Sequence, residues 1–305
     1  MNNSVKNSFK RLDIKLGFIC NNHCLHCAQG NKRNIFGNKS FKQLKNELKE
    51  GSYDCKQVVF TGGEPTIHKD FLDLISYARK LGFTNIQIQT NGRMFVYERF
   101  CKEVIDAGAN DFCLAVIGHN SRVHDYLSST KGSFKQTTYG IRNLKYLGVH
   151  VSTNTVISKL NYRHLPAVSN LLVELGVDQF QFAFPHPCGK AGENFLIIVP
   201  RMRSIISFVK KGLDIGIKAG KVVMTEAIPY CLMSGYEVFI AERAIPESIV
   251  FDVDYKVDNY SEYRKNQAKL KGSKCHLCKY YNVCEGPWRE YPERFGWGEF
   301  IPILV

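Results

Sequence analysis

The sequence lacks a hydrophobic run long enough to cross a membrane, and its first ten residues are too polar for a secretion signal. It contains neither a low-complexity segment nor a close internal repeat. Acidic residues are few, 28 Asp and Glu against 41 Lys and Arg, so the formal net charge is +13. These absences exclude membrane-spanning and secreted classes. A cytoplasmic globular chain of 305 residues, 44% hydrophobic, is expected, with room for a large core.

Eleven cysteines without a secretion signal indicate a reducing compartment, and metal sites rather than disulfides. Three of them form the run Cys20-x3-Cys24-x2-Cys27, directly after a strand-like segment at 12–19. A tight loop with this spacing can bring three thiolates to one metal centre. A four-iron cluster held by three cysteines keeps one iron open for a ligand that is not protein. Catalytic metal sites keep such an open position, whereas structural sites close it.

A disulfide frame, haem attachment and a zinc site would each use such a run of cysteines. A disulfide frame is disfavoured by the missing secretion signal. Haem attachment requires C-x-x-C-H, and Ala28 follows Cys27. A zinc site stays open, with His23 or His26 as the fourth ligand.

Basic charge is concentrated at the start of the chain. Residues 1–60 carry eleven Lys and Arg against four Asp and Glu, a net charge of +7. Such a region can steer an acidic partner, although solubility is the simpler explanation. The lysines are not interleaved with aromatic residues, which disfavours nucleic acid as the partner.

Hydrophobic periodicity predicts six strands that alternate with six helices. The strands are expected at 12–19, 57–60, 85–89, 111–117, 149–157 and 179–184, and the helices at 40–50, 68–81, 95–107, 134–147, 165–175 and 201–218. Strand–helix units in a row require a parallel sheet with right-handed crossovers. Six units rather than eight predict an α/β fold, a partial (β/α)6 TIM-like barrel at 8–218. Residues 219–305 break the alternation and are expected to form a small cysteine-rich extension.

Five candidate loops follow the predicted strands directly. They are residues 20–27, 62–65, 90–92, 118–120 and 185–188. In parallel barrels the chemistry sits at the carboxyl ends of the strands, so these loops should meet at one mouth of the barrel.

The cysteine run after the first strand, with Gly62-Gly63-Glu64-Pro65 after the second, resembles the radical S-adenosylmethionine (SAM) superfamily. The resemblance implies that Cys20, Cys24 and Cys27 hold a [4Fe–4S] cluster and that SAM chelates its fourth iron. It assigns Gly62, Gly63 and Glu64 to the methionyl ammonium group of SAM. Glycines allow close backbone approach, and a carboxylate accepts hydrogen bonds from an ammonium group. For the two glycines alone, a plain strand-to-helix turn is the simpler explanation.

Two positions depart from this family. His26 stands where an aromatic residue often precedes the last cysteine. Residues 115–118 read Ala-Val-Ile-Gly where relatives often carry a serine near the SAM ribose. The ribose contacts are therefore expected from Asn91 or Asn154, and for each an ordinary local hydrogen bond is the simpler explanation.

The last part of the chain supplies four further thiols, Cys231 and the run Cys275-x2-Cys278-x5-Cys284. The run resembles part of the SPASM and Twitch extensions of radical SAM enzymes, which implies an auxiliary [4Fe–4S] cluster. Trp288 stands where a full SPASM motif continues with cysteine, so one such cluster is expected. A four-thiolate zinc site stays open, because closed tetrahedral sulfur sites suit zinc equally well.

Four cysteines remain. Cys55, Cys101 and Cys113 fall in or beside predicted elements and are expected in the core. Cys188 lies in the loop at 185–188 and is a candidate hydrogen-atom donor, with an inert loop thiol as the simpler explanation.

The resemblance implies an enzyme that reductively cleaves SAM to a 5′-deoxyadenosyl radical and abstracts hydrogen from its substrate. The electron would come from a low-potential donor, flavodoxin or ferredoxin. The SPASM-like run favours peptide or protein modification. Oxidation or rearrangement of a small anionic metabolite or nucleotide is the alternative. From another class, a non-catalytic iron–sulfur or zinc-binding protein stays open.

Overall fold

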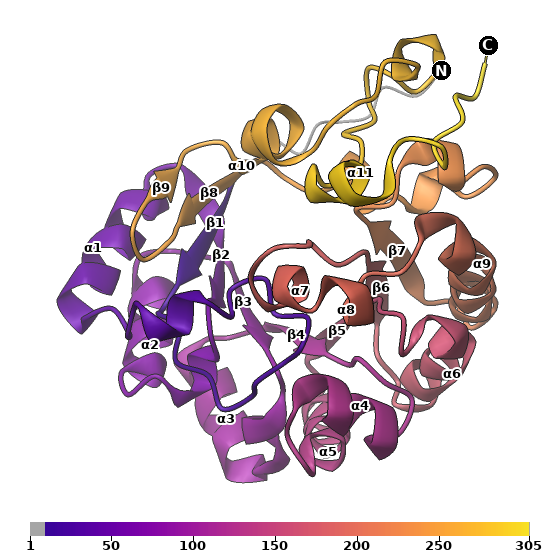
Figure 1. Cartoon of the computed structure of the whole chain (residues 1–305). Helices are drawn as coiled ribbons and strands as arrows, with labels where there is room; N and C mark the ends of the chain where they lie inside the picture. The colour runs from indigo at the N-terminus through magenta and orange to yellow at the C-terminus, as the bar shows by residue number, and fades with distance from the viewer. Residues whose placement is uncertain (1–9, 305) are drawn as a thin grey trace.

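The computed structural model describes residues 10–304 and is built around one nine-stranded sheet (Figure 1). The first two residues of the predicted 8–218 region lie outside the described residues. The strands are β1 (Lys10–Lys15), β2 (Cys55–Thr61), β3 (Asn85–Thr90), β4 (Asp111–Ala115), β5 (His150–Val156), β6 (Gln179–Ala183), β7 (Val222–Glu226), β8 (Ser248–Phe251) and β9 (Lys256–Val257). Their order is β7-β6-β5-β4-β3-β2-β1-β8-β9, and only the β8–β9 pair is antiparallel.

Most helices surround the outer face of this curved sheet, whereas α7 and α8 lie across its opening (Figure 1). The helices are α1 (Phe41–Ser52), α2 (Phe71–Lys80), α3 (Glu98–Ala107), α4 (Ser121–Ser128), α5 (Ser133–Tyr146), α6 (Leu165–Glu174), α7 (Gly189–Glu193), α8 (Phe195–Ile198), α9 (Met202–Lys218), α10 (Tyr260–Tyr263) and α11 (Glu290–Phe295). None of them is long and apolar enough to span a membrane within residues 10–304.

The two faces of each strand differ in polarity, as the period of two requires. In β3, Ile86 and Ile88 are buried in the core beneath the helices, whereas Gln87 and Gln89 line a cavity inside the barrel. The start of a helix is also determined by nearby residues. Ser40, for example, caps α1 by accepting a hydrogen bond from the Gln43 amide at 3.2 Å.

The predicted α/β fold, a parallel sheet curved into an open barrel, is confirmed. The largest boundary difference is at the end of the first strand, and several short helices were also missed. β1 ends at Lys15 instead of residue 19, because the chain then pairs with the segment before α1: Gly17 bridges Asn38, and the Phe18 amide donates to the Gly37 carbonyl. The short helices α4, α7 and α8 were not predicted, since each lies within a loop that follows a strand.

The sequence suggested that the alternation of strands and helices stops at residue 218, but in the structure a further strand follows. β7 follows α9 and pairs in parallel with β6, and β8 pairs in parallel with β1. Residues after 218 thus extend the sheet at both edges. β8 has only four residues, and neither β7 nor β8 is followed by a long helix that would complete a strand–helix unit, so the sequence pattern did not reveal them.

Candidate functional site

The cysteine loop, residues 20–27, follows β1 and is fixed by the end of α4. The His23 amide donates to the Ser128 carbonyl at 3.0 Å, and the Leu25 amide donates to the Leu127 carbonyl at 2.9 Å. All eleven cysteines of the chain are free thiols. The loop therefore offers three unpaired sulfurs on a backbone that its neighbours hold in place.

Two arginines, both later in the sequence, bind the backbone and side chains of the same loop. Arg93 Nη1 donates to the Asn21 carbonyl at 2.6 Å and to Asn22 Oδ1 at 3.0 Å. Arg33 Nη2 donates to the Asn22 carbonyl at 2.9 Å, and its Nη1 lies 2.7 Å from His23 Nδ1. Sequence reasoning missed both residues. The available signal was the position of Arg93, directly after Thr90-Asn91-Gly92.

The Gly-Gly turn packs directly on the backbone that leads into the cysteine loop. The Gly63 amide donates to the Gly17 carbonyl at 2.8 Å, and the Glu64 amide donates to the Ile19 carbonyl at 2.9 Å. A Cβ added to Gly63 would overlap the Ile19 carbonyl oxygen. Glycine is required here because the two backbones approach each other closely.

Glu64 is buried, and its carboxylate joins the ends of β2 and β3. Oε1 accepts hydrogen bonds from the Thr66 amide at 3.2 Å, from Thr66 Oγ1 at 2.6 Å and from Thr90 Oγ1 at 2.6 Å. Oε2 accepts from the Asn91 amide at 2.7 Å. Burial raises the pKa of Glu64, and these hydrogen bonds to the ionised form oppose that rise. The side chain also lies close enough to Cys20 for its charge to raise the pKa of that thiol.

The three thiols share one electrostatic environment. Burial raises the pKa of Cys20 and Cys27, and it raises the pKa of Cys24 to about 12 together with the charges of the two neighbouring sulfurs. The Arg33 guanidinium opposes the rise at all three sites. A metal that binds these sulfurs must therefore displace protons.

The two asparagines proposed for the ribose lie in different places. Asn91 is at the cysteine loop, where its Nδ2 donates to Asn21 Oδ1 at 2.7 Å. Asn154 lines the cavity inside the barrel, and its buried Oδ1 has no hydrogen-bond partner among residues 10–304. An unpartnered buried acceptor is costly, so Asn154 is available to a ligand or to water in that cavity.

His26 lies within the cysteine loop, and the fourth loop reaches that loop through α4. Burial lowers the pKa of His26 to about 4 and its Nδ1 has no partner in the described chain. Asn120 caps α4, since its Oδ1 accepts from the Val123 amide at 3.0 Å, and the far end of this helix binds the cysteine loop. The fourth loop thus acts at the site through a helix.

The fifth loop reaches the cysteine loop directly. Cys188 Sγ lies 3.6 Å from the Ala28 carbonyl, and the Lys190 amide donates to the Cys27 carbonyl at 2.9 Å. The structure therefore brings the predicted loops to one mouth of the barrel. The role of Cys188 as a hydrogen-atom donor stays a prediction.

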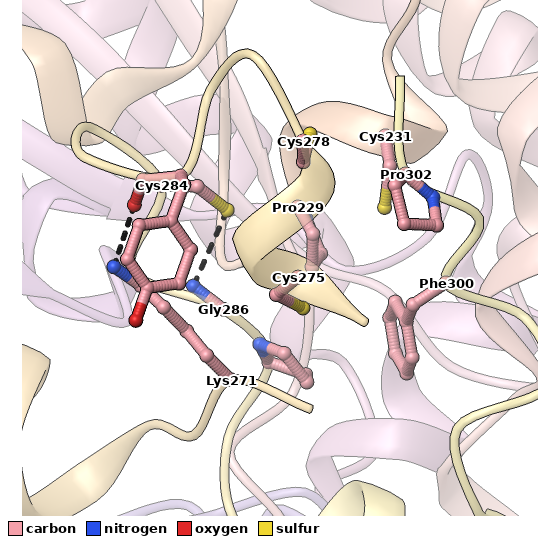
Figure 2. Close-up of a pocket in the computed structure, with 11 residues that line it drawn as sticks. Pro229, Cys231, Lys271, Cys275, Cys278, Cys284, Gly286, Phe300 and Pro302 are labelled. Carbon is pink, nitrogen blue, oxygen red and sulfur yellow. Dashed lines mark hydrogen bonds between the residues drawn. The ribbon is translucent and has the colours of Figure 1, made fainter. Parts of the chain in front are cut away.

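Four cysteines of the last part of the chain line a second pocket (Figure 2). Cys275, Cys278 and Cys284 come from one irregular segment, and Cys231 follows β7. Burial first, and then the charges of the other three sulfurs, raise the pKa of Cys231 to about 12. The Cys284 sulfur accepts from the Gly286 amide at 3.4 Å.

The barrel interior holds a cavity of about 370 Å³ with a polar lining. Its amide side chains come from three strands: Gln87, Gln89, Asn154, Gln179 and Gln181. Its charged side chains are Arg11, Asp13, Glu226 and Arg264. Both guanidiniums are paired, Arg11 with Asp13 at 2.7 Å and Arg264 with Glu285 at 3.0 Å. The lining thus offers hydrogen bonds and almost no net charge.

Comparison with known proteins identifies the family. A sequence model described as the radical SAM superfamily matches residues 14–172, which is more than half of the chain. Fe-coproporphyrin III synthase of Methanosarcina barkeri is 30% identical over 53% of this chain and 41% of its own length. GTP 3′,8-cyclase of Vibrio parahaemolyticus is 31% identical over 53% of this chain and 50% of its own length. The chain thus matches about half the length of these relatives.

Solved structures show the same fold. Streptococcus suis SuiB bound to S-adenosylmethionine has a TM-score of 0.68 at 17% identity, over 97% of this chain and 77% of its own. SuiB bound to its precursor peptide SuiA has a TM-score of 0.66 over 92% of this chain and 72% of its own. The family match covers the cysteine loop and the Gly-Gly-Glu turn, and the fold match extends over almost all of the chain. The chain belongs to the radical SAM superfamily.

Proposed function

We propose that this chain is an enzyme that reductively cleaves SAM and abstracts hydrogen from a substrate, with Cys20, Cys24 and Cys27 as the ligands of a [4Fe–4S] cluster. Members of this superfamily are enzymes, and the family implies both SAM and such a cluster. One observation carries the proposal: at the carboxyl end of the sheet, Glu64 binds Ile19 just before the cysteine loop and also binds Asn91, which binds Asn21 within that loop.

The donor set fits such a cluster. Each thiolate of a four-iron cluster binds a different iron, so the sulfurs need not converge on one point. Within residues 10–304, no three or more His, Cys, Asp and Glu side chains are arranged to hold a single metal ion. Arg33 places a positive charge near all three sulfurs, which favours their ionised form.

Glu64 can still accept a hydrogen bond from an ammonium group. A carboxylate offers about four acceptor positions, roughly two on each oxygen. Oε1 is saturated by Thr66 and Thr90, whereas Oε2 accepts only from the Asn91 amide. We therefore assign Gly62, Gly63 and Glu64 to the methionyl ammonium of SAM, with Asn91 and Asn154 as the candidate ribose contacts. When bound, SAM supplies the 5′-deoxyadenosyl radical that abstracts hydrogen.

A second [4Fe–4S] cluster is proposed at Cys231, Cys275, Cys278 and Cys284. The four thiols face one pocket (Figure 2), and the charges of the other three affect the pKa of Cys231. Four sulfurs also suit zinc by ligand type, although among residues 10–304 they are not arranged around one metal ion. Metal analysis separates the two: two four-iron clusters give about eight irons per chain, and one cluster with zinc gives about four irons and one zinc.

We favour a peptide as the substrate. The paired charges and amide side chains of the barrel cavity suit a neutral ligand with many hydrogen-bonding groups, such as a peptide main chain. A phosphorylated metabolite would need unpaired cations, and both guanidiniums that line this cavity are neutralised. The likeness in fold to peptide-bound SuiB agrees with this choice. Reaction at a nucleotide, as the name of GTP 3′,8-cyclase describes for that relative, is the alternative.

A non-catalytic iron–sulfur protein would not require the Gly-Gly-Glu turn beside the cysteine loop, and a zinc protein would be colourless. The test is release of 5′-deoxyadenosine by anaerobically purified, chemically reduced protein. We expect release by the wild type and by Cys101→Ala, a change at a buried core cysteine outside both proposed cluster sites, and none by Cys24→Ser, which should also lose about four irons per chain. If protein with intact clusters releases no 5′-deoxyadenosine, the proposed activity is contradicted. This holds whether or not calorimetry detects SAM binding.

Members of this superfamily require a reductant, and we propose flavodoxin or ferredoxin as the donor in a reducing cytoplasm. The free state of all eleven cysteines supports that compartment. The net charge of +13 supports an acidic partner.

A further inference from the structure

The barrel cavity contains a carboxylate that no ion pair neutralises among residues 10–304. It belongs to Glu226, the last residue of β7, at the same end of the parallel sheet as the cysteine loop. Its Oε2 accepts a hydrogen bond from Gln181 Nε2 at 3.0 Å, whereas Oε1 has no hydrogen bond within the described part of the chain. One oxygen of Glu226 is therefore left for a donor in the cavity.

The charged groups around Glu226 carry one more negative charge than positive. Three cations, Arg11, Arg264 and Lys269, face four carboxylates, Asp13, Glu226, Glu242 and Glu285. Each cation lies within 3.0 Å of a carboxylate other than Glu226. The excess negative charge thus belongs to Glu226, which faces the cavity.

This unpaired carboxylate is costly where it lies. Burial first, and then the charge of Glu242, raise the pKa of Glu226, and the neighbouring cations only oppose that rise. Glu242 is itself incompletely paired. Its Oε1 accepts from Lys269 Nζ and from the Ala227 amide, whereas its buried Oε2 has no partner among residues 10–304. A positively charged group of a ligand would offset this cost.

The cavity wall beside Glu226 offers a further acceptor. Asn154 on β5 lies next to Gln181 in the strand register, and its buried Oδ1 has no partner in the described chain. Ammonium and guanidinium groups carry several donors and no acceptor, so they suit such a wall. A phosphate or carboxylate group would instead be repelled by Glu226. Glu226 stays available even where Asn154 binds the ribose of SAM.

We propose that Glu226 binds a cationic side chain of the substrate inside the barrel cavity, the ammonium group of a lysine residue or the guanidinium group of an arginine residue. That the substrate is a peptide rests on the proposed function. The main chain of the peptide binds the amide side chains of the cavity, and Glu226 Oε1 accepts from the basic side chain. Glu226 thereby determines which residue of the peptide enters the barrel.

Two small compounds can take the place of the peptide in a binding experiment. Nα-acetyl-lysine N-methylamide carries the ammonium group, and Nα-acetyl-norleucine N-methylamide has an uncharged side chain of similar length. Saturation-transfer difference NMR would measure the binding of each to the anaerobic, cluster-loaded protein without SAM, at about 0.15 M NaCl to screen distant charges. SAM cleavage takes no part in this measurement, so a failure here is distinguishable from a failure to release 5′-deoxyadenosine.

We expect the wild type to bind the lysine compound about tenfold or more tightly than the norleucine compound, because a hydrogen bond between a buried carboxylate and an ammonium group is strong. The net charge of +13 opposes general attraction of a cation, so this preference requires a local acceptor. Glu226→Gln should abolish the preference. Glu247→Gln, the same change at an exposed position, should keep it.

Two results would overturn the proposal. The first is a wild type that binds both compounds equally, or that does not bind the lysine compound up to about 20 mM, and it requires no variant. The second is a Glu226→Gln protein that keeps the wild-type preference, because the cation would then bind elsewhere.

Discussion

At the scale of single residues, Glu64 and Asp252 show how a buried carboxylate can organise its surroundings. Glu64 accepts from donors on two segments, which follow β2 and β3, and Asp252 is enclosed by two lysines at the end of β8. Each oxygen is matched to donors, which is the condition under which a buried charge is tolerated. Replacement of either carboxylate by the amide of the same shape removes the charge but keeps the packing, so its effect on stability reports the contribution of the charge and its hydrogen bonds.

Glu64→Gln should destabilise the protein by about 1–3 kcal/mol, because an NH₂ group would face donors that now bind an oxygen. It should also weaken SAM binding severalfold, since Oε2 is the acceptor assigned to the ammonium group. Urea unfolding and calorimetry with SAM measure the two effects. Glu174→Gln, at an exposed helix end, is the matched control. A fully stable Glu64→Gln protein with wild-type SAM affinity would remove Glu64 from both roles.

Asp252 makes a pH-dependent contribution to stability. Burial would raise its pKa, but the charge of Lys15 and hydrogen bonds from Lys15, the Val253 amide and Lys32 outweigh burial and lower the pKa of Asp252 to about 2. A carboxyl whose folded pKa is depressed stabilises the fold above its unfolded pKa, near 4, and loses that effect as the pH falls toward 2.

Asp252→Asn should therefore lower the free energy of unfolding by roughly 2 kcal/mol at pH 7 and by much less near pH 2–3. Urea unfolding of both proteins across this range measures the difference, and shared effects of acid on the rest of the molecule cancel. Asp258→Asn, whose parent side chain is 78% exposed, should show little effect at any pH. A loss that stays constant with pH would contradict the ion-pair origin.

At the scale of elements, the ends of β1, β2 and β3 act as one unit. The backbone after β2 binds the backbone after β1, and the turn after β3 binds both through Glu64 and Asn91. The glycines after β2 allow this close contact. A small change in that turn should therefore displace the cysteine loop, although no cysteine is altered.

Gly63→Ala tests this coupling. The added methyl group would overlap the Ile19 carbonyl oxygen, so the turn or the cysteine loop must shift. We expect iron at the first site to fall by half or more, from about four atoms per chain, with the second site unaffected. Gly298→Ala, where a Cβ meets no atom within 4 Å, is the control for both sites. Full iron occupancy in Gly63→Ala would show that the two loops are independent.

At the scale of the whole molecule, the parallel sheet brings distant segments together and the net charge is strongly positive. Residues after 218 supply β7 at one edge and β8 beside β1. A buried network of charged side chains also joins the last segment to the barrel: Lys269 pairs with Glu242 at 2.7 Å and with Glu285 at 2.8 Å. The second cysteine site is thereby fixed to the barrel, since Glu285 follows Cys284.

The net charge of +13 predicts electrostatic steering of an acidic electron donor. Reduction of the protein by flavodoxin should slow by about tenfold or more between low salt and about 0.5 M NaCl, because the charges are then screened beyond a few ångströms. Stopped-flow absorbance measures this rate. Photoreduction through a neutral deazaflavin is the control and should not depend on salt. Equal salt dependence of the two would exclude steering by charge.

The sequence alone predicted what depends on short-range order. The spacing of Cys20, Cys24 and Cys27, the Gly-Gly-Glu turn and the alternation of strands and helices all lie within a few residues of one another, so sequence patterns report them directly. Helix caps such as Ser40 belong to the same class.

Only the tertiary structure decided which distant residues meet. Arg93 binds Asn21 across 72 positions of sequence, and Glu290 reaches His186 from the far end of the chain. The tertiary structure also showed that the two candidate ribose contacts lie apart: Asn91 is at the cysteine loop, and Asn154 is inside the barrel. The physical reason is that curvature and strand order of the sheet set these contacts, and both arise from the packing of the whole chain rather than from any local pattern.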